Sequence, residues 1–121
     1  MRSPPSLLLI RRLAAFAALM VAIVIAYLSL MPVDEGPAPV FTDKVNHFLA
    51  YAGLAAPLTL ALHPKRWLRA VIVATVYGIG LEFAQAMGDA GREGSVLDAV
   101  ANLLGALAGA ALIRFAAGVR P

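Results

Sequence analysis

Long apolar runs separated by short polar stretches dominate the sequence. A helix needs about 20 apolar residues to cross the roughly 30 Å hydrocarbon core of a bilayer. Four runs are close to that length, at residues 13–31, 45–62, 68–87 and 97–117. The pattern predicts an all-α bundle of four transmembrane helices, with residues 1–121 forming a single membrane domain.

The composition favours lipid over water as the surrounding solvent. Of the 121 residues, 61% are hydrophobic and 14% are charged, whereas about 25% of the residues of a soluble domain are charged. The chain contains no Cys, which excludes a disulfide framework, a thiolate metal site and a Cys nucleophile. Since the four runs leave few residues for a soluble domain, we expect the chemistry of the chain to lie in the membrane.

The positions of the basic residues predict the orientation of the bundle. Cytoplasmic loops of membrane proteins carry an excess of Lys and Arg. The two ends of the chain and the second loop hold eight of the ten basic residues, and the first and third loops hold two. We therefore expect both termini in the cytoplasm of a multi-pass protein of the cell (inner or plasma) membrane. Because the charges follow this pattern, the net charge of +3 gives no support to nucleic-acid binding.

Polar side chains recur at helical spacing near the outer ends of three predicted helices. A spacing of three or four residues places side chains on one helical face. In an antiparallel bundle these outer ends share one depth, so the three faces predict one polar site. Its candidate residues are Asp43, Lys44, His47 and Tyr51 before and on the second helix, Glu82 and Gln85 on the third, Arg92 in the following turn, and Ser95, Asp98 and Asn102 at the fourth.

Glu82 is the strongest of these candidates on energetic grounds. A carboxylate inside a span costs several kcal/mol unless it is paired, solvated or protonated. We therefore expect Glu82 to act as the central acceptor or base, with His47 as its proton partner and Asp98 as a third candidate for catalysis. The alternative is that Glu82 reaches the headgroup region through its flexible stem. Whether the chain is an enzyme stays open.

Asp43 and Asp98 each have a structural alternative. Both lie near a predicted helix N-terminus, where a carboxylate satisfies free backbone N–H groups and favours the helix dipole. Ser95 and Asp98 resemble a capping box with Asp in place of Glu. Asn102 lies one turn deeper than Asp98 and cannot be a cap, so its amide is expected to hydrogen-bond across helices.

Two further patterns bear on packing and on metal binding. Gly105 and Gly109 form a small-xxx-small pair that lets helices approach closely. The two imidazoles, His47 and His63, are predicted at opposite faces of the membrane, and a zinc site usually needs two or more imidazoles or thiolates. We therefore expect no metal site and no cofactor.

Taken in order, the polar residues resemble the VanZ-like family of small integral membrane proteins. The resemblance covers residues 43–109, and it implies a membrane fold with a polar site. The family's namesake is associated with resistance to the glycopeptide teicoplanin. The matching residues are Asp43-Lys44, His47-Phe48, Tyr51 and Leu54 on one helix, Glu82 and Gln85 closing the next, and then Arg92, Ser95, Asp98, Asn102, Gly105 and Gly109.

The leading functional hypothesis is an outer-leaflet pocket that binds or modifies an amphiphilic envelope component, such as a membrane lipid or a lipid-linked precursor. In it, Lys44 and Arg92 anchor an anionic headgroup, while Tyr51, Gln85 and other polar side chains orient it. The first alternative is a non-catalytic structural or accessory subunit, in which the polar faces of the helices form a polar seam that packs them together and recruits a membrane protein partner. Whether the chain forms a homo-oligomer stays open. The second is a small proton-coupled transporter, which the clustering of polar groups at one face disfavours.

The orientation can be tested by labelling single Cys variants of this Cys-free chain in intact cells. A thiol reagent that cannot cross the membrane should modify Cys placed at Glu35 or Gly91 and spare Cys placed at Lys65. The basic residues predict this result because they assign the second loop to the cytoplasm. Labelling at Lys65 would reverse the orientation.

Overall fold

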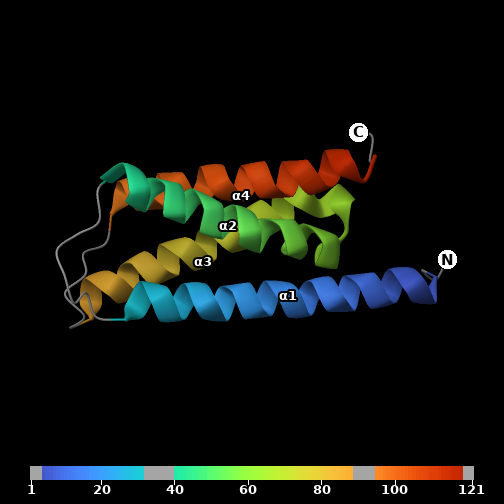
Figure 1. Ribbon diagram of the computed structural model, residues 1–121, viewed down its shortest axis with the longest axis horizontal. Helices are drawn as coiled ribbons and strands as arrows, with labels where there is room; N and C mark the ends of the chain where they lie inside the picture. The colour runs from blue at the N-terminus through green and yellow to red at the C-terminus, as the bar shows by residue number, and fades with distance from the viewer. Residues whose placement is uncertain (1–3, 32–39, 89–94, 119–121) are drawn as a thin grey trace.

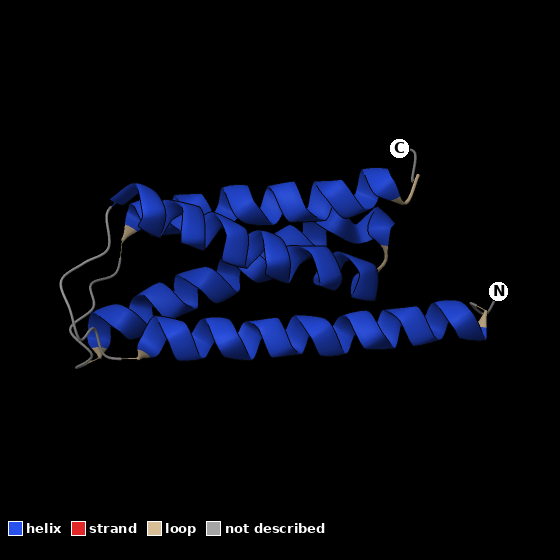
Figure 2. Ribbon diagram, viewed as in Figure 1, coloured by secondary structure: helices blue, strands red, loops and turns tan. Residues whose placement is uncertain are grey.

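The chain folds into four long α-helices. The structure is a computed structural model and describes residues 4–31, 40–88 and 95–118. Each long helix has the length and composition to cross a membrane, and the described residues contain no strand (Figure 2). The predicted all-α fold of four transmembrane helices is therefore confirmed. The elements are α1 (Pro5–Leu30), α2 (Val40–Leu62), the short 3-10 helix η1 (Pro64–Arg66), α3 (Trp67–Met87) and α4 (Val96–Ala116).

The helices lie side by side with alternating direction (Figure 1). The start of α1 and the end of α4 lie at one end of the bundle, where α2 ends and α3 begins (Figure 1). At the opposite end α1 and α3 finish while α2 and α4 begin, and we call this the polar end. The candidate residues on α2, α3 and α4 therefore share one end of the molecule.

Helix α1 begins at Pro5 and so extends well before the predicted start of its span at residue 13. Proline is favoured in the first turn of a helix because its missing N–H has no helical acceptor there. Arg11 lies inside this helix, and its Nε donates a hydrogen bond of 3.0 Å to the carbonyl of Ala61. That carbonyl is in the last turn of α2, where carbonyls lack helical partners. Arg11 therefore links α1 to α2.

Helices α2 and α4 form the closest contact in the bundle. A Cβ atom on Gly105 would collide with the main chain of Phe48, and a Cβ atom on Gly109 would collide with the main chain of Ala52. The two glycines and their two partners are each one helical turn apart, so the contact runs along both helices. The close approach expected from the glycine pair is confirmed.

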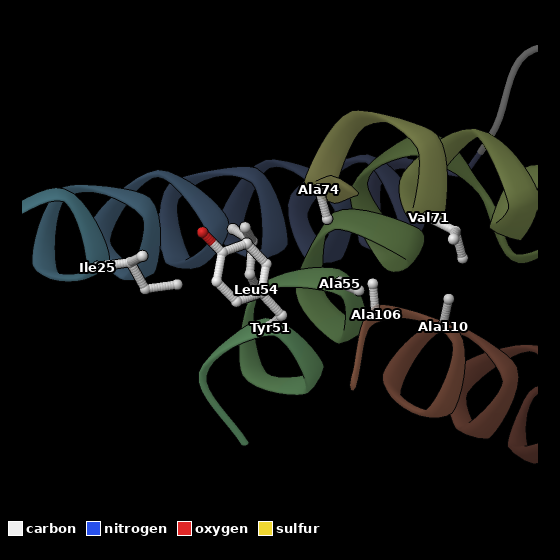
Figure 3. Packing of buried hydrophobic residues seen from close by; sticks show 8 residues of the cluster. All are labelled: Ile25, Tyr51, Leu54, Ala55, Val71, Ala74, Ala106 and Ala110. Atoms are coloured by element: carbon white, nitrogen blue, oxygen red, sulfur yellow. The ribbon is translucent and has the colours of Figure 1, made fainter. Parts of the chain in front are cut away.

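Small and medium-sized side chains from all four helices fill the core (Figure 3). Many larger apolar side chains face outward instead, including Phe83 and Phe115, which are 66% and 67% exposed. Lipid tails are as apolar as these side chains, so the outward positions suit a membrane environment. The labelled core residues are Ile25, Tyr51, Leu54, Ala55, Val71, Ala74, Ala106 and Ala110.

The α2–α4 contact predicts the effect of adding one methyl group. Gly105→Ala should lower the free energy of unfolding by about 1–3 kcal/mol, because the main chain of Phe48 must move. Gly80→Ala is the matched control, since nothing lies within 4 Å of the position of its added Cβ atom. Because Ala is a better helix former than Gly, this substitution should raise the free energy of unfolding by up to about 1 kcal/mol. Reversible denaturant unfolding in mixed micelles measures both. Equal effects of the two substitutions would contradict the close contact.

Candidate functional site

Five side chains from α2 and α4 meet at the polar end, and we call them the polar cluster. On α2, Asp43 lies in the first turn and His47 follows one turn later. On α4, Asp98 lies in the first turn and Asn102 follows one turn later. Lys44 completes the group, and the contacts among these residues are all between side chains. The cluster thus consists of two facing pairs of residues with i,i+4 spacing and one lysine.

Lys44 joins the two carboxylates of the polar cluster. Its Nζ donates to Asp43 Oδ2 at 3.1 Å and to Asp98 Oδ1. The side chain of Asp98 is only 12% exposed, and a buried charge that loses its partner is strongly destabilising. Lys44 is therefore a cross-helix ion-pair partner whose charge is already balanced inside the cluster.

His47 is held by Asn102. Its Nδ1 lies 2.8 Å from Asn102 Oδ1. Because an amide oxygen only accepts, Nδ1 carries the hydrogen of this bond. The other ring nitrogen, Nε2, lies 3.5 Å from Asp98 Oδ2 and 3.8 Å from Asp43 Oδ1. The ring is therefore fixed with Nε2 facing two carboxylates, and Asn102 is almost completely buried behind it.

Glu82 lies in the C-terminal half of α3 and links this helix to the start of α4. Its Oε2 accepts a hydrogen bond of 2.7 Å from the backbone N–H of Ser95. Ser95 is the N-cap of α4, and its Oγ accepts from the backbone N–H of Asp98 at 3.2 Å. In a capping box, the side chain at Asp98 would take the Ser95 N–H. Glu82 takes it instead, which leaves the Asp98 carboxylate available to α2.

The expected proton pair of Glu82 and His47 stays a prediction, because the hydrogen bond of Glu82 goes to the backbone N–H of Ser95. The carboxylates beside His47 are Asp43 and Asp98, while Glu82 binds a helix N-terminus. A carboxylate inside a span needs a partner, and a backbone N–H can be that partner as well as an imidazole can. Every helix has free backbone N–H groups at its start. A search for partners among side chains alone does not include them.

Gln85 and Tyr51 lie outside the polar cluster. Gln85 Nε2 donates at 2.8 Å to the carbonyl of Ser29, in the last turn of α1. Tyr51 is 3% exposed in the hydrophobic core, and its ring lies so close to Gly78 that a Cβ there would be 2.9 Å from Cε1. Both side chains hold helices together. Arg92 lies outside the described residues.

An apolar groove runs between α1 and α2. Its volume is about 310 Å³. Ala50, the α2 residue that lines it, is three positions from His47 in the sequence. We call this apolar groove the α1–α2 groove. Its lining residues are Met20, Val21, Val24, Ile25, Leu28 and Ala50.

A known protein family matches most of the chain. The model of the VanZ/LLP1 family matches residues 5–117. The chain belongs to the VanZ/LLP1 family. The match includes α1, whereas the resemblance in the sequence rested on residues 43–109. Together with the four candidate spans, it identifies a VanZ-like multi-pass membrane protein.

Searches of curated proteins and of solved structures return no match to the chain. The functional argument therefore rests on the site itself.

Proposed function

We propose that the polar end binds an amphiphilic component of the cell envelope, with its polar head at the polar cluster and its apolar chain in the α1–α2 groove. One observation carries this proposal: the α1–α2 groove and the polar cluster lie at nearly the same depth in the bundle. Ala50 in the groove and His47 in the cluster are three residues apart on α2, which corresponds to about 4.5 Å along the helix axis. An acyl chain in the groove would bring its head to the level of the cluster.

The exposure of the cluster supports access from outside the bundle. The side chains of Asp43 and Lys44 are 40% and 28% exposed, while those of His47 and Asp98 are 19% and 12% exposed. A ligand can therefore approach the outer pair and reach the inner pair behind it. If the orientation predicted by the basic residues holds, this access is from the outer leaflet of the inner or plasma membrane.

The charges of the cluster indicate which head groups suit it. Two carboxylates and one ammonium give a net negative charge when His47 is neutral, and Lys44 is already paired. A head group with hydroxyl or amine donors fits this surface better than a bare anion. The imidazole beside two carboxylates also offers a proton donor or acceptor for a modification step. Teicoplanin resistance would be one outcome, through binding of a lipid-linked envelope precursor or of the drug's acyl tail.

The accessory-subunit alternative has one observation in its favour. Gln85 and Tyr77 from α3 bind main-chain carbonyls of α1, at Ser29 and Ala22. These two polar side chains hold α3 against α1. In the accessory-subunit alternative, all polar side chains of the bundle have this packing role. The exposed, charged part of the polar cluster is what favours ligand binding instead. The proton-coupled transporter is less well supported, because the cluster lies at one end of the spans.

The groove predicts a position-specific effect on lipid labelling. We expect a phospholipid with a photoreactive group in its acyl chain to label groove residues of the purified protein in nanodiscs. Val24→Trp should reduce this labelling at least several-fold by filling the groove. Ile23→Trp is the matched control, because Ile23 is a similarly exposed apolar residue of α1 that does not line the groove.

Labelled peptides identified by mass spectrometry provide the measurement. Equal labelling in the two variants would show that the groove has no particular affinity for acyl chains. The proposal would then lose the observation that carries it.

A further inference from the structure

Three potential metal ligands of the polar cluster converge at the polar end. They are Asp43, His47 and Asp98, and one ligand atom from each lies within 4.8 Å of the others. His47 Nε2 is 3.5 Å from Asp98 Oδ2 and 3.8 Å from Asp43 Oδ1. Hydrogen bonds of this kind are normally about 2.7–3.2 Å long. Nε2 therefore faces both carboxylates across a gap wider than a hydrogen bond.

The two distances from His47 Nε2 are close to the edge lengths of a metal coordination shell, and all three ligand atoms lie within 4.8 Å of one another. Zinc bonds to nitrogen and oxygen of about 2.0–2.2 Å place neighbouring ligands of a tetrahedral site about 3.3–3.6 Å apart. The two distances from Nε2 agree with this range to within a few tenths of an ångström.

His47 has the orientation of a metal-binding imidazole. Its Nδ1–H donates to Asn102 Oδ1 at 2.8 Å, so a neutral ring presents the lone pair of Nε2 to the carboxylates. Histidine ligands of metals almost always donate their second ring N–H in this way, which fixes the tautomer and the ring direction. Asn102 is 2% exposed, so its amide is held rigidly behind the ring.

Lys44 does not bind the carboxylate oxygens that face His47. It binds Asp43 Oδ2 and Asp98 Oδ1, whereas the oxygens nearest His47 are Asp43 Oδ1 and Asp98 Oδ2. Each carboxylate therefore uses one oxygen for the ammonium and turns the other toward the imidazole. With the imidazole neutral, the two carboxylates and the Lys44 ammonium carry a net negative charge, which attracts a cation.

We propose that Asp43, His47 and Asp98 bind one divalent transition-metal ion of the zinc class, with Asn102 and Lys44 as positioning residues. An imidazole together with carboxylates suits Zn²⁺ better than Mg²⁺, which prefers oxygen ligands and retains its waters. Three protein ligands leave at least one of the four positions of zinc for a water or for an oxygen of a ligand. Two carboxylates here supply the ligands for which a second imidazole is missing. With the metal bound, Nε2 of His47 is a ligand and no longer a proton donor or acceptor. Metal binding itself does not depend on whether an amphiphile binds.

The test is calorimetric titration of the untagged, metal-free protein in detergent with Zn²⁺, repeated in excess Mg²⁺. We expect one Zn²⁺ per chain and little competition from Mg²⁺. Asn102→Ala should weaken binding by about 10- to 100-fold, and His47→Gln by a larger factor. One control should keep full affinity: His63→Gln, which removes the other imidazole. Loss of binding in His63→Gln, or unchanged binding in His47→Gln, would overturn the proposal.

A second measurement needs no variant and so does not depend on the folding of His47→Gln. X-ray absorption at the zinc edge of the native chain with one equivalent of Zn²⁺ should show one imidazole among oxygen ligands. A shell with two imidazoles, or oxygen ligands alone, would contradict the assignment. Because the probe is the metal by itself, failure here leaves the acyl-chain labelling test unaffected.

Discussion

The close approach of α2 and α4 is the constraint on which the rest of the structure depends. At Gly105 and Gly109 the main chain of α4 meets the main chain of Phe48 and Ala52 on α2 without an intervening side chain. Lipid gives helices no hydrophobic reason to associate, so such contacts, together with hydrogen bonds, must hold them together. The same contact sets the register of the two helices, which brings their first turns to one level.

The register in turn places two i,i+4 pairs opposite each other. Asp43 and His47 on α2 face Asp98 and Asn102 on α4, and Lys44 joins the carboxylates. Glu82 supports this arrangement from α3, because it binds the N–H of Ser95 that Asp98 would otherwise take in a capping box. A polar site is thereby held on three rigid helices. Its outer side chains stay exposed while Asn102 is buried.

The sequence predicted the helices and the residues that share each helical face, because length and the period of 3.6 residues are local properties. It did not predict how neighbouring faces are rotated toward each other. Shared depth suggests His47 as the partner of Glu82, and depth alone does not reveal the backbone N–H of Ser95 that Glu82 binds. Gln85 and Tyr51 lie on the expected faces but bind or pack against other helices. The sequence predicts that Arg11 precedes the first span, because a positive charge next to an apolar run usually marks the end of the span. The structure places Arg11 inside α1, where its side chain binds the carbonyl of Ala61.

The central claim is that His47 is held by Asn102 across the α2–α4 contact and not by Glu82. A double-mutant cycle tests it most directly, through the free energies of unfolding of His47→Ala, Asn102→Ala and the double variant, alongside a parallel cycle of His47 with Glu82. Interhelical hydrogen bonds in a membrane protein have coupling energies of about 0.6 kcal/mol on average and about 1.7 kcal/mol at most. The structure predicts a coupling in that range between His47 and Asn102 and a smaller one between His47 and Glu82. A coupling to Glu82 that equals or exceeds the coupling to Asn102 would contradict the account.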